Sequence, residues 1–176
     1  MRASAETEGP EVSGSKELVL RKKKAMGTLT EQMKQLVERQ RLGFVATVCA
    51  DGTPNVSPKG TLRVLDDERL VFADLKSPGT VRNLRQNSSI EVNVVDQFIR
   101  KGFRFKGHAE VLDSGAEFER LAGFYATLGL SDAPKKIQTI IIITIEHARP
   151  LVSPAYDYGA EEDAMRAQWT SYYLGD

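Results

Sequence analysis

The sequence predicts a mainly β (α+β) fold, a small antiparallel barrel with peripheral helices. Segments of strand-forming residues dominate the chain, and the Asp51-Gly52 dipeptide is a strong hairpin signal. The predicted helices do not alternate regularly with the strands, as a doubly wound parallel sheet would require. A closed antiparallel sheet is therefore favoured. With 176 residues, of which 41% are hydrophobic and 27% charged, the chain is long enough for one domain with a substantial core.

The N-terminal residues 1–26 are expected to form a flexible basic extension. They include several Gly, Pro and Ser residues and the basic run RKKK at 21–24, without an apolar segment long enough for a signal peptide. The folded domain is expected over residues 27–176, with a helical tail at its end. Its first helix should begin at Thr28, because Glu31 follows three residues later as in a capping box, and should end near Arg41.

Two hairpins are predicted after this helix. Gly43 introduces the first, whose strands should cover residues 44–48 and 54–57 around the Asp51-Gly52 turn. The second joins residues 61–65 to residues 70–73 through an acidic turn.

A helix is predicted from Ser77 to about Asn87. Ser77 is a favourable N-cap residue, Pro78 suits the first helical position, and Gly79 removes side-chain bulk there. Beyond it we expect strands at 90–95, 102–112 and 137–146, a helix opened by a Ser114/Glu117 capping box, and a short final helix at 161–173. The apolar run IQTIIIITI at 137–145 is about half of the roughly 20 residues that a membrane helix needs. Its β-branched residues instead indicate a buried strand.

Composition excludes several classes of function. Lys+Arg and Asp+Glu are both 24, so the chain lacks the basic footprint of a nucleic-acid-binding protein. Cys49 is the single cysteine, which excludes internal disulfides and multi-cysteine zinc sites and fits a reducing, cytoplasmic setting. His108 and His147 are isolated in the sequence, so no metal site is expected. The zero net charge permits a homodimer.

The start of the Ser77 helix is the candidate binding site. An open helix N-terminus offers unpaired backbone N–H groups and the positive end of the helix dipole, both of which stabilise an anion. Thr80 can add a hydroxyl donor, while Arg82 and Lys59 can supply the cations that a phosphate needs. The alternative is an ordinary capped helix that binds nothing.

Five segments in a fixed order carry a family resemblance: GFVATV, DGTPNVSP, LVFAD, TVRNLRQN and RFKGHAEVL, within residues 29–156. This order resembles the pyridoxamine 5'-phosphate oxidase-like proteins and small flavin reductases, which share an FMN-binding split β-barrel. The resemblance implies a homodimer with flavin at the interface. It also implies an FMN-dependent oxidoreductase that transfers hydride between flavin N5 and a small-molecule substrate or a nicotinamide.

The resemblance also assigns candidate cofactor contacts. In that family the segment matching residues 55–59 follows the flavin ring, and the segments matching 72–74 and 77–80 hold the phosphate. By position, the candidate FMN contacts are Val56, Ser57, Lys59, Ala73, Asp74, Ser77, Thr80 and Arg82. Lys59 would face the pyrimidine edge or the phosphate. At the ring its cation would stabilise the negative charge that develops on reduction.

Two departures and three alternatives accompany the resemblance. Many relatives place Lys at or just before Thr80, where this chain has Pro78 and Gly79, and the C-terminal tail has no His, which disfavours oxidation of vitamin B6. The protein could instead be a non-catalytic FMN carrier or sensor, or a barrel that binds haem or F420. An anionic F420 tail would want a basic groove, which Arg100, Lys101, Arg104 and Lys106 could supply. Tyr156, Tyr158 and Trp169 are expected either to close over the ring from a partner subunit or to pack a dimer.

Overall fold

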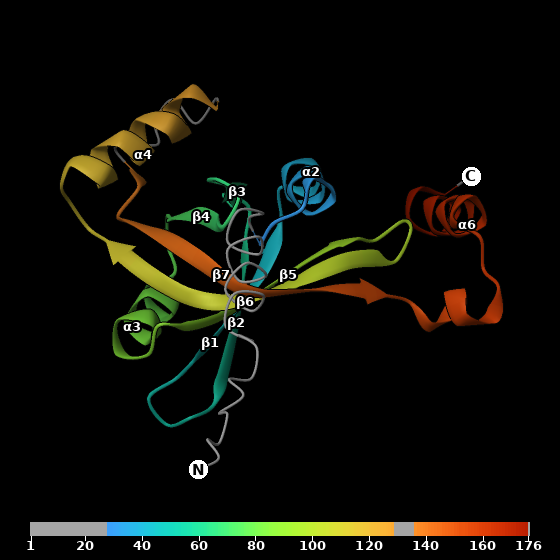
Figure 1. Ribbon diagram of the computed structural model, residues 1–176, viewed down its shortest axis with the longest axis horizontal. Helices are drawn as coiled ribbons and strands as arrows, with labels where there is room; N and C mark the ends of the chain where they lie inside the picture. The colour runs from blue at the N-terminus through green and yellow to red at the C-terminus, as the bar shows by residue number, and fades with distance from the viewer. Residues whose placement is uncertain (1–27, 129–135, 176) are drawn as a thin grey trace, which may run out of the picture.

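The architecture is one curled, seven-stranded antiparallel sheet with helices around it, seen in a computed structural model that describes residues 28–128 and 136–175 (Figure 1). The expected basic extension at 1–26 lies outside the described residues. The sheet order is β2-β1-β5-β6-β7-β4-β3. The strands are β1 (Gly43–Val48), β2 (Pro54–Lys59), β3 (Arg63–Val64), β4 (Arg69–Asp74), β5 (Ser89–Asp96), β6 (Lys101–Leu112) and β7 (Thr139–Val152). The predicted antiparallel fold is confirmed.

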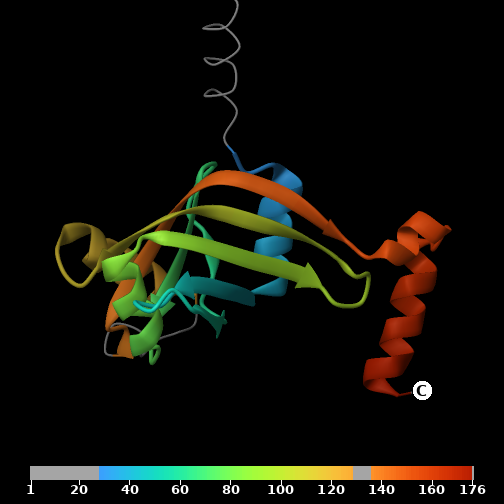
Figure 2. The same ribbon diagram turned by 90° about the horizontal axis from the view of Figure 1, so that it is seen from below.

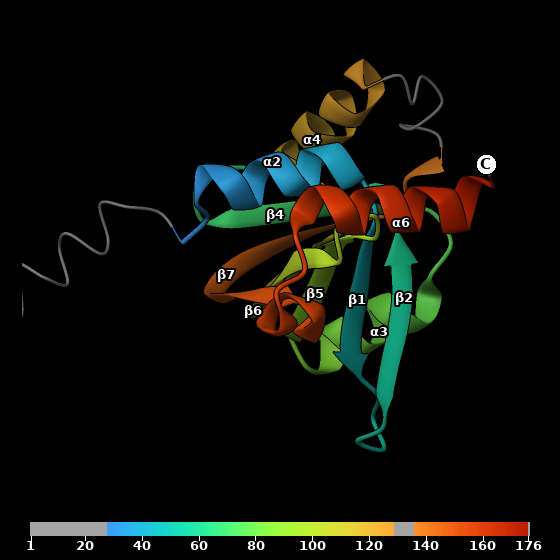
Figure 3. The same ribbon diagram turned by 90° about the vertical axis from the view of Figure 1, so that its right-hand side faces the viewer.

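The helices surround the sheet, and the last one stands apart from it. They are α2 (Glu31–Gln40), α3 (Pro78–Gln86), α4 (Ala116–Thr127), the 3-10 helix η1 (Pro154–Tyr158) and α6 (Glu162–Leu174). Figures 1 and 2 show α6 beyond the end of the β5–β6 turn, away from the body of the barrel. In the view of Figure 3, α2 lies toward the top of the molecule and α3 toward the bottom. Within the described residues, no helix is long and apolar enough to span a bilayer.

The helix starts differ from the predicted capping boxes. The N-cap of α2 is Thr30, whose hydroxyl accepts a hydrogen bond from the Met33 N–H at 3.3 Å, so the predicted start at Thr28 is two residues early. The predicted box at Ser114 is wrong, because α4 starts after Gly115 with a backbone φ of 97° and no side-chain cap. Glu117 pairs instead with Arg120, and α4 is positioned by packing of Leu121 and Tyr125 in an apolar cluster with β7.

The two predicted hairpins form around their turns. In the first, Gly52 has a φ of 83°, which favours glycine, and the Asp51 carboxylate accepts a hydrogen bond from the Thr53 N–H at 3.0 Å. In the second, the predicted strand at 61–65 contributes only Arg63 and Val64 to the sheet. Leu62 beside it is fully buried and serves the core instead.

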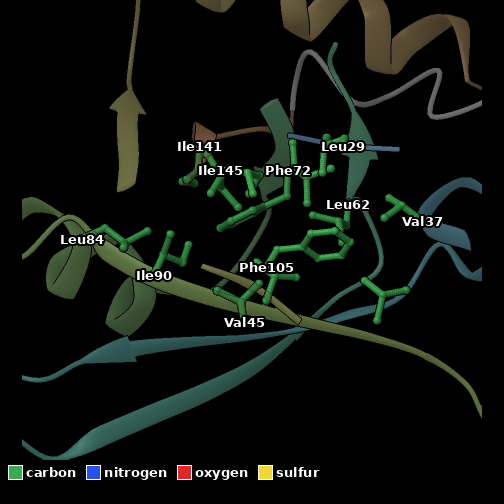
Figure 4. Close-up of a cluster of buried hydrophobic side chains, with 14 of the residues drawn as sticks. Leu29, Val37, Val45, Leu62, Phe72, Leu84, Ile90, Phe105, Ile141 and Ile145 are labelled. Atoms are coloured by element: carbon green, nitrogen blue, oxygen red, sulfur yellow. The ribbon is translucent and has the colours of Figure 1, made fainter. Parts of the chain in front are cut away.

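The apolar run of β7 is buried on both faces. Ile141, Ile143 and Ile145 point into the main core, whereas Ile140 and Ile142 join a second cluster with Leu121 and Tyr125 of α4. Figure 4 shows how Ile141 and Ile145 lie with Phe72 inside the barrel. Burial on both faces explains why this strand has a continuous apolar run instead of an alternating pattern.

Strands β6 and β7 form the longest pairing, and a register shift between Lys106 and Gly107 interrupts it. Before the shift, β6 pairs with the distal part of β7, residues 147–152. After it, β6 pairs with the part of β7 that also pairs with β4. A Cβ at Gly107 would lie 1.9 Å from the Thr144 carbonyl oxygen. The absence of a side chain at 107 therefore allows the close approach of the two strands.

Gly107→Ala is expected to lower the free energy of unfolding by about 3 kcal/mol, because either the ladder or the bulge must move. Urea unfolding measures the effect. Gly123→Ala in α4 is the control, since no atom lies within 4 Å of its added Cβ, and it should stabilise the protein by about 0.5–1 kcal/mol. Equal stabilities for the two variants would contradict the close approach.

Candidate functional site

A cleft of about 340 Å³ opens where β2 and β4 end and α3 begins. Four of the predicted cofactor contacts line it, namely Ser57, Lys59, Ala73 and Ser77. The fold brings them together because β1, lying next to β2, is joined through β5, β6 and β7 to β4 as the sheet curls. Residues about 18 positions apart in sequence thus share one wall, and Lys59 and Ser77 are in direct contact.

Lys59 is the central group of the cleft. Although it lines the cleft, only 4% of the residue is exposed, and its amine donates hydrogen bonds to the hydroxyl oxygens of Ser57 at 2.6 Å and Ser77 at 2.7 Å. The amine also lies 5.6 Å from the centre of the Phe72 ring. Burial lowers the pKa of Lys59 below its usual value, and the negative charge of Asp74 opposes that shift. The cation is therefore held where its own hydration is poor, and an added anion would be attracted to it.

Asp74 lies behind this wall and supports it. Its carboxylate, only 2% exposed as a residue, accepts hydrogen bonds from the Ser77 hydroxyl and, at 3.3 Å, from the Ser77 N–H. Ser77 occupies the predicted N-cap position of α3, but its hydroxyl makes no capping hydrogen bond to the helix. The first N–H groups of α3 therefore keep their capacity to bind an anion.

The other predicted contacts lie around the cleft without lining it. Thr80 is buried in the first turn of α3, and Arg82 is exposed on the same helix. Val56 is 63% exposed on β2, a strand at the edge of the sheet. An edge strand carries unpaired backbone N–H and C=O groups, so β2 can bind a ligand through its main chain.

Two polar residues that line the cleft were not predicted from the sequence. Lys76 is exposed at the cleft directly before the N-cap of α3, where it can provide the cation that the Pro78-Gly79-Thr80 segment lacks. Its position next to Ser77 could have indicated this role. Thr61 is the second: its hydroxyl donates to the Ala73 carbonyl at 2.7 Å, and its carbonyl accepts from the Tyr125 hydroxyl at 2.9 Å. This buried network joins residues that are far apart in sequence, so no local pattern indicates it, and it fixes the base of the cleft.

The four basic residues considered for an anionic tail do not form one groove. Arg104 and Lys106 both pair with Glu91, at 2.9 and 3.2 Å. Arg100 stacks over the Trp169 ring at 3.6 Å, and Lys101 pairs with Glu162 at 3.0 Å. Each of these cations already has a partner within the chain.

Two of the three aromatic residues considered for closing over the flavin ring also have partners within the chain. The Tyr156 hydroxyl donates to the Ile99 carbonyl at 2.7 Å, and Trp169 is covered by Arg100, so both serve their own chain. Tyr158 is 89% exposed. Of these three residues, only Tyr158 is available to another molecule.

The histidines lie at a different cleft, also about 340 Å³, on the other part of the sheet. His108 lies 3.3 Å from a Glu146 carboxylate oxygen and 3.3 Å from the Ser88 hydroxyl. Among residues 28–128 and 136–175, no three His, Cys, Asp or Glu side chains gather in a way that could hold a metal ion.

Comparison with known proteins gives one family match. The family model described as pyridoxamine 5'-phosphate oxidase matches residues 29–151. An uncharacterized protein of Methanocaldococcus jannaschii is 30% identical over 96 residues, which are 53% of this chain and 62% of that protein. The chain therefore spans about three-fifths of the length of this curated relative.

Solved structures share the fold. HupZ of Group A Streptococcus is 33% identical with a TM-score of 0.63, over 71% of this chain and 95% of that one. A proposed pyridoxamine 5'-phosphate oxidase of Lactobacillus delbrueckii is 26% identical with a TM-score of 0.57, over 69% and 93%. Two structures are alike in fold alone: an FMN-binding protein of Syntrophomonas wolfei (16%, TM-score 0.59, over 80% and 96%) and an F420 reductase (24%, 0.53, over 69% and 98%).

The buried amine of Lys59 is expected to titrate below the ordinary lysine pKa of 10.5. NMR titration of the lysine Cε resonances measures this pKa, and the Lys59→Arg variant assigns the signal. Asp74→Asn should lower it further, because the opposing negative charge is removed. A Lys59 signal that titrates with the exposed lysines would contradict the buried geometry.

The same shift predicts a pH dependence of stability. Unfolded Lys59 keeps its proton up to about pH 10.5, whereas folded Lys59 releases it earlier. Between the two pKa values the unfolded state binds more protons, so the contribution of Lys59 to the free energy of unfolding rises with pH. Denaturant unfolding from neutral pH upward should show this rise in the wild type. Lys59→Arg, which stays charged, should lack it.

Proposed function

The chain belongs to the pyridoxamine 5'-phosphate oxidase family, and on that premise we propose that it is an FMN-dependent oxidoreductase. The flavin, when bound, would supply hydride transfer between its N5 atom and a small-molecule substrate or a nicotinamide. The chain's own part is to bind the cofactor, to orient it and to place charge beside it. We infer a cytoplasmic setting from the single cysteine.

The observation that carries this proposal is the buried Lys59 amine in a cleft at the start of α3. A phosphate would be held by the N–H groups of α3 and the Lys76 cation. The edge strand β2 would hold the ring through its main chain. Lys59 lies between these two regions, in contact with Ser57 of β2 and with Ser77 before α3.

Lys59 would also tune the reactivity of a ring placed beside it. A cation in a poorly hydrated position stabilises nearby negative charge more strongly than one in water. Because reduction adds negative charge to a flavin, Lys59 would favour the reduced form. The cost of burying this cation is offset by two hydroxyl groups and the Asp74 carboxylate, so it is in place before any ligand binds.

We further propose a homodimer with the flavin at its interface. The cleft lies beside β2, the edge strand of the sheet, and a cofactor bound there would stay partly exposed to solvent. A second subunit would cover it and exclude water from the reacting atoms. The small-molecule substrate would then enter between the subunits.

Purified protein is expected to show a flavin absorption spectrum and to release FMN on acid treatment, identified by mass. Lys76→Ala should weaken FMN binding about 10-fold to 100-fold, the value for losing a charge-assisted contact. Arg85→Ala is the matched control, because Arg85 lies in the last turn of α3 and pairs with Asp113. Equal FMN affinity in the two variants, measured by fluorescence titration, would contradict the phosphate site. Release of F420 or haem instead would identify that molecule, and not FMN, as the cofactor.

Bound FMN is expected to be reduced by NADH or NADPH or by a small-molecule donor. Anaerobic stopped-flow absorbance measures this rate. Lys59→Met should bind FMN less tightly and should also lower its reduction potential, because the cation beside the ring is lost. A flavin that no donor reduces at a useful rate would favour a carrier or sensor over an enzyme.

A further inference from the structure

A bulge in β7 places two consecutive side chains on the outer face of the sheet. The ladder with β6 passes from the pair Lys106–His147 to the pair Gly107–Ile145, so Glu146 has no partner in it. Ile145 is buried, whereas Glu146 and His147 are both exposed. In a regular strand the side chains alternate, and His147 would point to the inside of the barrel. Bulges of this kind re-aim side chains and are frequent beside active sites.

The bulge brings the Glu146 carboxylate to His108 of β6. A Glu146 carboxylate oxygen lies 3.3 Å from His108 Nε2, and the Ser88 hydroxyl oxygen lies 3.3 Å from His108 Nδ1. A carboxylate only accepts hydrogen bonds, so Nε2, which faces it, carries a proton. In the neutral imidazole Nδ1 is then the acceptor, and the Ser88 hydroxyl donates to it. The three side chains therefore form a hydrogen-bonded relay in the order hydroxyl, imidazole, carboxylate.

Backbone contacts hold Ser88 in this position. It lies between the end of α3 and the start of β5, and its carbonyl accepts a hydrogen bond from the Ala109 N–H at 2.8 Å. Because Ala109 directly follows His108 on β6, Ser88 is fixed to the strand that carries the imidazole. The Asn87 side chain accepts from the Ser89 N–H at 3.0 Å and fixes the turn before β5. Ser88 is exposed, so a substrate can reach its hydroxyl.

A cleft of about 340 Å³ lies beside this relay. Its polar part includes three side chains from the bulge and from the strand next to it, namely His108, Glu146 and His147. Its apolar part comes from the β1–β2 hairpin, namely Ala46, Val48 and Pro54. Within the described residues the imidazole of His147 has no hydrogen bond or ion pair, so its N–H can donate to a ligand. The cleft is large enough for a small molecule with one apolar group.

We propose that this cleft is a separate catalytic site, at which Ser88 attacks short-chain carboxylic esters and passes their acyl group to water. A serine, an imidazole and a carboxylate in hydrogen-bonded order activate a hydroxyl for acyl transfer, on whatever fold they occur. Both contacts are 3.3 Å long, as such contacts often are before a substrate binds. The candidate cofactor cleft contacts the end of β2 at Lys59, whereas this cleft contacts its start at Pro54. The proposal therefore does not rest on a bound flavin.

The reaction balances without a cofactor. The Ser88 oxygen bonds to the ester carbonyl carbon while its proton passes to His108 Nδ1, and Glu146 stabilises the imidazolium that forms. His147 is the donor available to the developing oxyanion. The bond between the carbonyl carbon and the alcohol oxygen then breaks, and the alcohol leaves with the proton from His108. Water attacks the acyl-serine by the same route, which releases the carboxylic acid and restores Ser88.

A fluorophosphonate probe tests the nucleophile in the full chain. This reagent phosphonylates an activated serine with loss of fluoride, and peptide mass spectrometry locates the adduct. We expect the adduct at Ser88, its loss in Ser88→Ala, and unchanged labelling in Ser89→Ala, the matched control one residue away. His108→Gln should slow labelling by about 10-fold or more, because the base is lost. Absence of an adduct, or an adduct only at another serine, would overturn the proposal.

Hydrolysis of p-nitrophenyl acetate measures turnover. The wild type should exceed Ser88→Ala by about 10-fold or more, and the quenched reaction should contain acetyl-Ser88. Glu146→Gln should lower kcat by about 10-fold or more without changing the unfolding curve, because Glu146 is exposed. Glu110→Gln, which removes another exposed carboxylate near His108 on β6, is the control and should keep full activity.

Equal turnover in the wild type and Ser88→Ala, or acetylation of a histidine alone, would overturn the proposal. Turnover is measured on the protein as purified and again with saturating FMN, and we expect the same rate in both. A protein that hydrolyses the ester but takes up no flavin supports this site and contradicts the proposed function. A protein that binds FMN but has no activated serine does the reverse.

Discussion

The pairing of β6 with β7 is the constraint on which the rest of the structure depends. The first half of β7 is paired on both sides, with β4 and β6, and its isoleucines divide between two apolar clusters. Beyond the register shift at Gly107, β7 continues with β6 alone and leads to η1 and α6. The β6–β7 ribbon therefore covers the core at one end and leads into η1 and α6 at the other. A side chain at 107 would separate these strands at the point where both functions meet.

The candidate site depends on a buried cation. An unpaired charge at 4% exposure would be costly, and the structure offsets that cost with two hydroxyl acceptors and a buried carboxylate. The same arrangement orients Ser77 away from capping α3. The first N–H groups of α3 and the Lys59 amine are thus both left able to bind a ligand. This preorganisation links the stability of the fold to its proposed cofactor chemistry.

Local signals predicted the elements well and their ends less well. Asp51-Gly52 marked its hairpin because a turn is decided by a few backbone angles, and the isoleucine run marked β7 because burial on both faces requires it. The capping boxes at Thr28 and Ser114 failed, since each competes with other residues for the same role. At the site, four of the residues predicted as cofactor contacts line one cleft, namely Ser57, Lys59, Ala73 and Ser77, and Lys76, which was not predicted, lines it too. Their role in holding a cofactor stays a prediction.

The sequence by itself determined the fold class, the strand-rich order of elements and the charged residues available for an anion, because these follow from local backbone preferences and composition. The tertiary structure alone decided which of those residues meet. Only the curl of the sheet brings Lys59 to Ser77, and only packing lowers the pKa of its amine. Tertiary contacts also place Arg100 over Trp169 and pair Lys101 with Glu162, so these two cations hold α6 and do not form a groove. Contacts between distant segments depend on strand register and burial, which no short stretch of sequence encodes.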